Sequence, residues 1–219
     1  MLEKAGLRLF NCHNAICDCD DKMLTFIRLA GGGIPVPKTL SGLLCYDNDA
    51  QISVRTLGKI EAQLGYPVVV KSCYGSLGKG VFLAEDRAAL AKIMGELKCQ
   101  PHLFQQFIKS SAGRDIRVIV IGGRYFASMQ RKSGGDFRSN IELGGKGEPF
   151  DAPQELIDMC ERTARLLNLD YCGIDVLFGD NGYILCEVNS NAFFGGIEKV
   201  TGKNVAKAYA EYILKQIYC

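Results

Sequence analysis

The chain has 219 residues, a length that suits one large domain or two small lobes. Hydrophobic residues make up 47% and charged residues 23% of the sequence, an ordinary globular mixture that excludes disordered, collagen-like and fibrous classes. The formal net charge of +2 is far from the basic imbalance that binding to a phosphate backbone usually requires, so we expect no nucleic-acid partner.

Membrane and secretion signals are not apparent in the sequence. No apolar run approaches the ~20 residues that cross a bilayer, and Met1 is followed by Leu-Glu-Lys rather than by a basic and then hydrophobic stretch. We therefore expect no membrane partner and a cytoplasmic location.

The cysteines predict reduced thiols rather than a disulfide scaffold. The sequence holds 10 of them, and several sit within apolar segments, as Cys73, Cys160, Cys172 and Cys186 do. Such positions are typical of buried free thiols.

Four potential metal ligands lie close together in the sequence, namely Cys12, His13, Cys17 and Cys19. Zinc sites usually combine one close pair of ligands with a second, distant pair. The preferred interpretation is a cysteine-rich loop, with a metal site as the alternative.

The first half of the chain predicts a small sheet with helices against it. The expected elements are a short strand at 7–11, a helix capped by Asp20 or Asp21, an extended edge segment at 35–39, a helix at 53–64, strands at 68–71 and 81–84 around a glycine loop, a helix capped by Asp86, and a strand at 103–107.

After Ser110 the pattern changes and predicts a second lobe. The expected elements are a hairpin with strands at 116–121 and 125–129, a mobile glycine-rich loop at 132–149, a helix along 156–167, strands at 173–178 and 183–189, and a closing helix along 205–216.

The last hairpin brings two acids together. A three-residue loop at 180–182 would pair Gly179 with Tyr183 and would place Asp175 directly opposite Glu187. Because side chains alternate along a strand, one face would carry Asp175, Glu187 and Asn189. The other face would carry apolar residues, namely Ile174, Val176, Ile184 and Val188.

This acidic face predicts a metal site. Like charges directly opposed on a sheet are destabilising, so we expect a cation between Asp175 and Glu187. Carboxylate and carboxamide oxygens, the latter from Asn189, suit Mg²⁺ or Mn²⁺ rather than zinc. A polar strand face turned toward solvent is the alternative.

A glycine loop follows the strand at 68–71. Gly75, Gly78 and Gly80 would let backbone N–H groups approach phosphate oxygens, and Lys71 would add positive charge. The spacing is not that of a Walker A loop, because Cys73 stands in place of its first glycine. The pattern favours a flap over a nucleotide, with a simple glycine hairpin as the alternative.

Three arginines add to the candidate site. Arg117 and Arg131 fall on the predicted hairpin of the second lobe, and Arg138 falls in the glycine-rich loop. Guanidinium groups suit phosphate and carboxylate oxygens. Each alone is more often a surface charge, but together with the acidic face they indicate a site between the two lobes.

In this order the motifs closely resemble the ATP-grasp superfamily, specifically its RimK-type amino-acid ligases. The motifs are Asp21-Lys22, Pro67-Val-Val-Val-Lys71, Gln105-Gln-Phe-Ile108, Asp115-Ile-Arg117, Asp136-Phe-Arg-Ser-Asn140, Gly173-Ile-Asp175 and Glu187-Val-Asn189. The resemblance implies an α+β ATP-grasp fold, two α/β lobes with the nucleotide cleft between antiparallel sheets. It implies an initial strand and loop at 1–20, an N-terminal lobe with the flap at 21–110, and a C-terminal lobe with the metal site at 111–219.

The resemblance also implies residue roles around ATP. Lys22 and Lys71 would hold the α- and β-phosphates. The flap would contribute Ser76, Gly78 and Gly80. The hinge that takes the adenine edge through backbone groups would be Gln106, Phe107 and Ile108, and Asp115 would lie near the ribose.

The remaining implied roles concern catalysis and metal. The γ-phosphate and the acceptor carboxylate would be surrounded by Arg117, Arg131 and Arg138 as catalytic residues, with Ser139 and Asn140 beside them. Two Mg²⁺ (or Mn²⁺) ions would be held by Asp175, Glu187 and Asn189.

The implied activity is ATP- and Mg-dependent carboxylate–amine ligation through an acyl phosphate. An amino acid such as glutamate would be joined to a carboxyl terminus or a small-molecule acid. The expected partners are small-molecule or peptide carboxylates and amines, with a protein tail as a further option, and a homo-oligomer is left open. The alternatives are an ATP-grasp phosphotransferase and a non-catalytic nucleotide-binding module.

Two departures from the family pattern stand out. Family members usually begin with a further small α/β domain, whereas this chain starts inside the pattern, so we expect an excised piece, a truncated gene product or half of a split enzyme. Gln106 stands where many relatives carry a glutamate, which leaves the nucleotide preference open.

Overall fold

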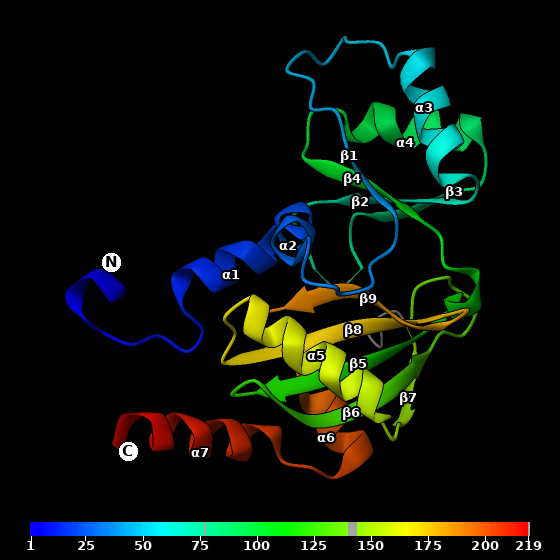
Figure 1. The fold of residues 1–219 in the computed structure, drawn as a ribbon. Helices are drawn as coiled ribbons and strands as arrows, with labels where there is room; N and C mark the ends of the chain where they lie inside the picture. The colour runs from blue at the N-terminus through cyan, green and yellow to red at the C-terminus, as the bar shows by residue number, and fades with distance from the viewer. Residues whose placement is uncertain (77, 140–143, 219) are drawn as a thin grey trace.

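Two antiparallel sheets, one above the other, organise the chain in the computed structural model, which describes residues 1–76, 78–139 and 144–218 (Figure 1). Within those residues the upper sheet has strand order β1-β4-β2-β3. Its strands are β1 (Thr39–Ser41), β2 (Val68–Ser72), β3 (Val81–Ala84) and β4 (His102–Gln106). The lower sheet has order β7-β6-β5-β8-β9. Its strands are β5 (Arg114–Ile121), β6 (Arg124–Lys132), β7 (Lys146–Pro149), β8 (Tyr171–Gly179) and β9 (Gly182–Asn189). The expected α+β class is confirmed.

The upper sheet is covered by the helices α3 (Val54–Leu64) and α4 (Arg87–Leu97) (Figure 1). Each begins where the sequence predicts, because the Ser53 hydroxyl accepts from the Arg55 N–H and the Asp86 carboxylate accepts from the Ala89 N–H at 2.8 Å. Their apolar faces pack against the sheet and form one hydrophobic cluster with it. The cluster includes Leu57, Ile60, Val68, Val70, Leu90 and Phe104.

The start of the chain is helical. It forms η1 (Glu3–Ala5), α1 (His13–Asp20) and α2 (Lys22–Leu29). The expected cap on α2 is confirmed, since Asp21 Oδ1 accepts from the Met23 N–H at 2.9 Å and from the Leu24 N–H at 3.2 Å. The preferred interpretation of 12–19 as a loop is wrong, because α1 occupies most of it.

The short strand predicted at 7–11 is also wrong, because these residues have no ladder partner in the structure. The Asn11 side chain holds this segment instead. Its amide donates to the Tyr171 carbonyl at 2.7 Å and the Ser190 carbonyl at 2.9 Å. Its oxygen accepts from the backbone N–H groups of Asp170 and Tyr171. The Asn11 side chain thus satisfies these backbone groups, in place of the ladder hydrogen bonds that a strand at 7–11 would have made.

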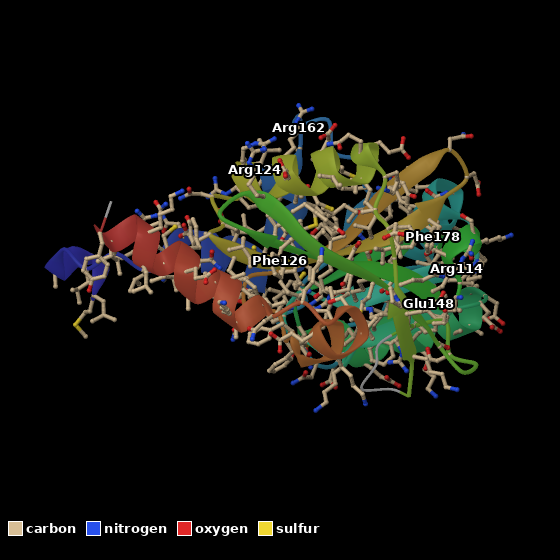
Figure 2. The ribbon with its side chains drawn as sticks, turned by 90° about the horizontal axis from the view of Figure 1, so that it is seen from below. Arg114, Arg124, Phe126, Glu148, Arg162 and Phe178 are labelled. Carbon is tan, nitrogen blue, oxygen red and sulfur yellow. The ribbon has the colours of Figure 1, made fainter. Side chains whose placement is uncertain are left out.

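The lower sheet is covered by α5 (Gln154–Leu166), and α6 (Gly195–Thr201) and α7 (Val205–Tyr218) follow β9 (Figure 1). The loop expected at 132–149 contains β7, which pairs with β6, while residues 140–143 lie outside the described part. Seen from below, the Arg114 guanidinium lies against the Phe178 ring, 4.5 Å from its centre (Figure 2). Within the described residues no helix is long and apolar enough to span a bilayer.

The lower sheet shares its core with the first helices of the chain. The cluster joins Ala15 of α1 and Phe26 of α2 to Leu156 and Cys160 of α5 and to inward residues of β5, β8 and β9. The cysteines with described geometry are free thiols, as the composition indicates. Cys12, His13, Cys17 and Cys19 form no metal-binding group among the described residues.

The β8–β9 hairpin pairs Asp175 with Glu187, as predicted, but its turn length and its register near the turn differ from the prediction. Gly179 pairs with Gly182 around a two-residue turn, so the predicted three-residue loop is wrong. A bulge at Cys186 then shifts the register by one residue and restores the predicted pairing. The shift turns Leu185 into the core in place of the predicted Ile184.

Candidate active site

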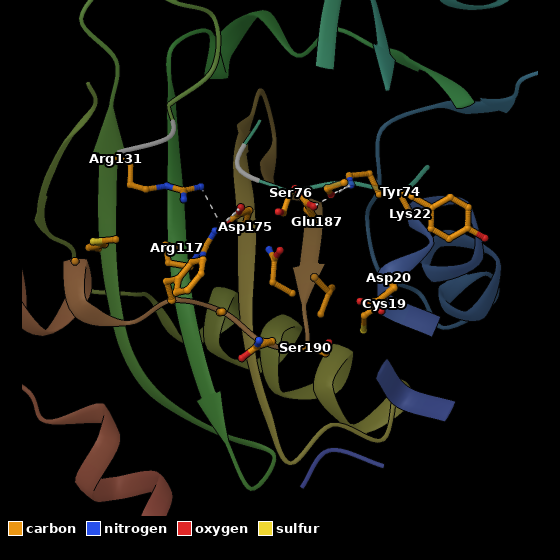
Figure 3. Close-up of a pocket in the computed structure, with 18 residues that line it drawn as sticks. Cys19, Asp20, Lys22, Tyr74, Ser76, Arg117, Arg131, Asp175, Glu187 and Ser190 are labelled. Atoms are coloured by element: carbon orange, nitrogen blue, oxygen red, sulfur yellow. Dashed lines mark hydrogen bonds and ion pairs between the residues drawn. The ribbon is translucent and has the colours of Figure 1, made fainter. Parts of the chain in front are cut away.

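Two adjoining cavities lie between the sheets. The larger has a volume of about 520 Å³ and is lined from α2, the flap, β5, β6, β8, β9 and the segment after β9 (Figure 3). The smaller has a volume of about 100 Å³ and is lined from β2, β4, the hinge after β4 and residues 137–139. Arg131, Asp175 and Glu187 line both, so the two cavities meet at the acidic pair.

Asp175 stands in a row of charged residues across three strands. Arg117 of β5 pairs with it on one side and Glu187 of β9 on the other. The Arg117 guanidinium forms a bidentate ion pair with the Asp175 carboxylate (Figure 3). Its Nε donates to Oδ1, and its Nη2 donates to Oδ2 at 2.8 Å. Arg117 therefore offsets the negative charge of Asp175.

Arg131 is the second cation on Asp175, at 3.0 Å from Nη2 to Oδ1. Its guanidinium also forms an ion pair with Asp115, the residue opposite it in the β5–β6 ladder, and its Nε donates to Asp115 Oδ1 at 2.7 Å. Arg131 is only 4% exposed. Burial lowers its pKa, but the two carboxylates outweigh that effect and raise the pKa, so Arg131 stays charged.

The charge state of Asp175 follows from the same contacts. Burial alone would raise the pKa of the carboxyl group, but Arg117 and Arg131 outweigh it and hold the pKa below its usual range. Asp175 is thus an anion at neutral pH. An anionic oxygen donor is what a magnesium site requires.

Lys22 and Lys71 contact consecutive residues of β9. Lys22 Nζ lies 3.4 Å from Glu187 Oε1 and donates to the Gly75 carbonyl at 2.6 Å. Lys71 Nζ, from the upper sheet, lies 3.6 Å from the Cys186 sulfur. Both lysines are buried, and Lys22 lines the larger cavity while Lys71 lines the smaller one.

The third predicted metal ligand has an unsatisfied amide. Asn189 lines the larger cavity, and its Nδ2 is buried without a hydrogen-bond partner in the described structure. A side-chain amide can be turned by 180° with little change in shape, which would place its oxygen at this unsatisfied position. Asp175, Glu187 and Asn189 therefore fit a hard divalent cation. Within the described residues no group of three His, Cys, Asp or Glu offers an alternative metal site.

The flap residues lie at different depths. Ser76 lines the larger cavity and Gly78 the smaller. Gly80 lies beside the neighbouring strand instead, with φ +72° and with its unfilled Cβ position 2.9 Å from Ser72 Cβ. Gly80 therefore shapes the hairpin and is not among the residues lining either cavity.

Arg138 connects the lower lobe to the flap. Its Nη1 donates to the Gly78 carbonyl at 3.0 Å, and its remaining nitrogens bind Asp136. Ser139 is buried and lines the smaller cavity. Asn140, the last member of this predicted set, lies outside the described residues.

The predicted hinge lines the smaller cavity with Gln106, Phe107 and Ile108, and Asp115 lies across from it. The Gln106 N–H already donates to the Lys38 carbonyl at 2.9 Å, so this N–H is not available to a base. Sequence reasoning missed Gln105, which is 1% exposed and donates to the Thr39 hydroxyl at 3.0 Å. A glutamine at a core position of a predicted strand was the available signal.

Other lining residues also escaped sequence reasoning. Cys186 enters the cleft only because of the bulge, and no pattern in the sequence marks that bulge. The larger cavity is further lined by Asp20, Tyr74, Ser190, Asn191 and Phe193. The acidic run at Asp20 and the polar run after Asn189 were visible, but nothing placed them on a cavity wall.

Comparison with known proteins gives these features a context. Residues 19–213 match the RimK-like ATP-grasp domain family. Human N-acetylaspartylglutamate synthase A is 39% identical over 216 residues, which are 97% of this chain and 54% of that protein. A probable alpha-L-glutamate ligase of Maridesulfovibrio salexigens is 36% identical over 216 residues, 97% of this chain and 69% of that protein.

Among solved structures, the ATP-grasp ligase PsnB complexed with a phosphomimetic variant of minimal precursor, Mg and ADP has a TM-score of 0.73 at 24% identity. The match covers 98% of this chain and 64% of that one, and it supports the fold. The chain spans about half the length of the synthase relatives, 54% in the human case. The family match and the identity to the bacterial relative show that this chain belongs to the RimK-like ATP-grasp family.

Proposed function

We propose that this chain carries the active site of an ATP- and Mg-dependent carboxylate–amine ligase. The observation that carries the proposal is the junction of the two cavities at Asp175, Glu187 and Arg131. A nucleotide in the smaller cavity would point its terminal phosphate at this junction. An acceptor carboxylate in the larger cavity would meet it there.

Each side of the junction has residues suited to its substrate. On the nucleotide side, Lys71 would neutralise phosphate charge, and Phe107 and Ile108 would meet the base. Lys22, which lines the larger cavity, would neutralise phosphate charge at the junction beside Glu187. Asp115 is gripped by Arg131, so we assign it to holding that arginine as well as to the ribose side. Arg138 and Ser139 would close the smaller cavity from the lower lobe.

Asp175, Glu187 and Asn189 would hold the metal, and we propose two Mg²⁺ (or Mn²⁺) ions shared with the phosphates. When bound, the divalent cation supplies charge neutralisation for the phosphoryl oxygens. The protein's own part is positioning and electrostatic stabilisation, because phosphoryl transfer needs no covalent help from a side chain.

The proposed reaction has two steps. A carboxylate oxygen attacks the γ-phosphorus, the bond to the bridging oxygen breaks, and ADP leaves. An amine nitrogen then attacks the acyl carbon, the carbon–oxygen bond to phosphate breaks, and the nitrogen loses a proton. Water would hydrolyse the acyl phosphate, so the flap and its contact with Arg138 would also serve to exclude solvent.

For the amine substrate we propose an amino acid such as glutamate, since the two relatives described above are named N-acetylaspartylglutamate synthase A and probable alpha-L-glutamate ligase. The acceptor would be a small-molecule or peptide carboxylate. The larger cavity, open and lined by charged residues, is consistent with such an acceptor.

The test combines substrate-dependent phosphate release with mass spectrometry. Glutamate and a panel of carboxylic acids and short peptides are supplied with ATP and Mg²⁺, and an amide product with equimolar ADP is expected. Glu187→Gln should reduce turnover by about 100-fold or more. Glu148→Gln is the matched control, because Glu148 pairs with Lys132 at the surface and lines neither cavity.

The other outcomes identify the competing functions. A stable phosphate ester without an amide would indicate a phosphotransferase. Binding of ATP without ADP formation for any acid in the panel would indicate a nucleotide-binding module.

A further inference from the structure

We propose that the larger cavity holds an apolar subsite beside Arg117, and that the acceptor acid therefore carries an apolar group close to its reacting carboxylate. The subsite is formed by Met129, Ala192 and Phe193, which all line this cavity. The inference rests on the proposed function, which by itself requires only a carboxylate. It narrows the class of acceptor that this chain takes.

Phe193 is a large aromatic side chain that is open to the cavity. It is 71% exposed and lines the cavity together with polar residues such as Asn189, Ser190 and Asn191. A buried aromatic side chain covers about 150–250 Å² of apolar surface. Removal of such surface from water is favourable, so a ligand with an apolar group gains affinity by covering the Phe193 ring.

The backbone on both sides of Phe193 is held by the protein core. Ala192 is buried, and its carbonyl accepts from the Tyr171 hydroxyl at 2.7 Å. Phe194 packs edge-on against the Tyr171 ring, with 6.4 Å between the ring centres. The Phe194 carbonyl also accepts from the Glu198 N–H at 2.9 Å, at the start of α6. Phe193 is thus positioned at the cavity wall by its neighbours, which reduces the ordering cost for a ligand that covers it.

The position of the subsite relative to Arg117 follows from Gly173 and from the sheet. A Cβ at Gly173 would lie 2.4 Å from Ala192 Cβ and 3.3 Å from both Cδ and Nη1 of Arg117, so these two side chains lie close together above β8. Phe193 directly follows Ala192. Met129 is the partner of Arg117 in the β5–β6 ladder. Because β5 lies between β6 and β8, Arg117 has apolar side chains on both sides.

This arrangement favours the acceptor as the occupant. The family resemblance assigns the acceptor carboxylate to arginines that include Arg117. An apolar group attached near that carboxylate would then meet Met129 or Phe193. An aromatic ring also attracts cations, but the guanidinium beside the subsite disfavours a second positive charge there.

The first test compares the binding of two acids that differ only in an isobutyl group, N-acetylglycine and N-acetylleucine. Calorimetric titrations are made with and without Mg·ADP. N-acetylleucine should bind about 10-fold more tightly. Phe193→Ala should lose most of this preference, and Phe193→Leu, which keeps an apolar side chain, should retain most of it.

Tyr46→Ala is the matched control for removal of an exposed aromatic ring. Tyr46 is 95% exposed and is not among the residues lining either cavity. The preference for N-acetylleucine should be unchanged in this variant. Thermal unfolding of all three variants checks that each is folded, which we expect because both side chains are exposed.

A second measurement locates the bound acid. The ¹³C-methyl signal of Met129, assigned by its loss in Met129→Leu, should shift on addition of N-acetylleucine and should shift less with N-acetylglycine. The signal of Met94 is the internal control, because Met94 belongs to the hydrophobic cluster of the upper lobe and should not respond. A response of Met94 alone would place the acid elsewhere and overturn the subsite.

The remaining outcomes separate the subsite from the proposed function. Equal binding of the two acids, no binding of either, or a preference that survives in Phe193→Ala overturns the subsite, and Mg·ADP binding with amide formation would leave the function standing. Tighter binding of N-acetyllysine than of N-acetylleucine would show that the ring takes a cation and would also overturn it. If the preference holds but no amide forms with any acid, the function fails and the subsite stands as a binding site.

Discussion

Cys186 and Glu187 are neighbours in β9, yet both of their side chains face the cleft. Cys186 lines the smaller cavity and Glu187 lines both cavities. Neighbours on a regular strand point to opposite faces. The bulge at Cys186 removes that alternation, so one strand meets Lys71 and Lys22 with consecutive residues.

The two acids of the row should differ sharply in their effect on stability. Asp175→Asn leaves Arg117 and Arg131 buried with a weakened partner, and we expect a loss of about 3 kcal/mol in the free energy of unfolding. Glu187 is 28% exposed, so Glu187→Gln should cost less than about 1 kcal/mol. Urea unfolding measures both. Equal losses would show that Asp175 is not the centre of the ion-pair network.

Two glycines provide a matched pair for a Cβ substitution. At Gly173 a Cβ would lie 2.4 Å from Ala192 Cβ, so Gly173→Ala should destabilise the protein by about 1–3 kcal/mol. At Gly95, within α4, a Cβ meets nothing within 4 Å, so Gly95→Ala should stabilise it by about 1 kcal/mol. Thermal unfolding of both variants checks the signs, and destabilisation by Gly95→Ala would contradict the open space above α4.

A surface carboxylate should make stability depend on acid pH. Hydrogen bonds from Arg87 and Tyr66 lower the pKa of Glu61 to about 2 from its ordinary value of 4.5. Because the folded-state pKa lies below the unfolded one, the stabilisation is complete above pH 4.5 and is lost as the pH falls toward 2. The stability difference between the unaltered protein and Glu61→Gln should therefore shrink over this range. A difference that stays constant on acidification would contradict the lowered pKa.

Thiol reactivity should follow burial. Burial raises the pKa values of Cys19 and Cys160 to about 12, and it raises that of Cys172 as well. Iodoacetamide at pH 8, read out by mass spectrometry, should therefore label the exposed Cys17 and Cys99 in the native protein. The three buried thiols should react only after unfolding. Rapid labelling of Cys160 in the native state would show that the lower core opens.

Much of the fold was predictable because local signals determine it. Ser53, Asp86 and Asp21 mark helix starts through their own capping bonds, and these were recognised in the sequence. The pairing of Asp175 with Glu187 was also predicted, although two errors cancelled. The two-residue turn and the bulge each shift the register by one residue, in opposite senses, and neither has a distinct sequence signal.

The ion pairs of the site could not be predicted in the same way. Arg117 and Arg131 were recognised as candidate anion-binding residues, but their grip on Asp175 arises from the ladder order of β6, β5 and β8. That order is a tertiary property. For the same reason the segment before α1 was misassigned, because the bonds that Asn11 makes to residues 170, 171 and 190 span most of the chain.

The sharing of the lower core between α1, α2 and the later strands has a consequence for synthesis on the ribosome. The upper lobe draws its hydrophobic cluster from residues 40–104, a continuous stretch, so it can fold as soon as that stretch has emerged. Ala15 and Phe26 must wait for Ile174, Leu185 and Val188, which are made much later. The earliest helices are thus among the last to be buried, and nascent chains stalled before β9 should expose them to chaperones.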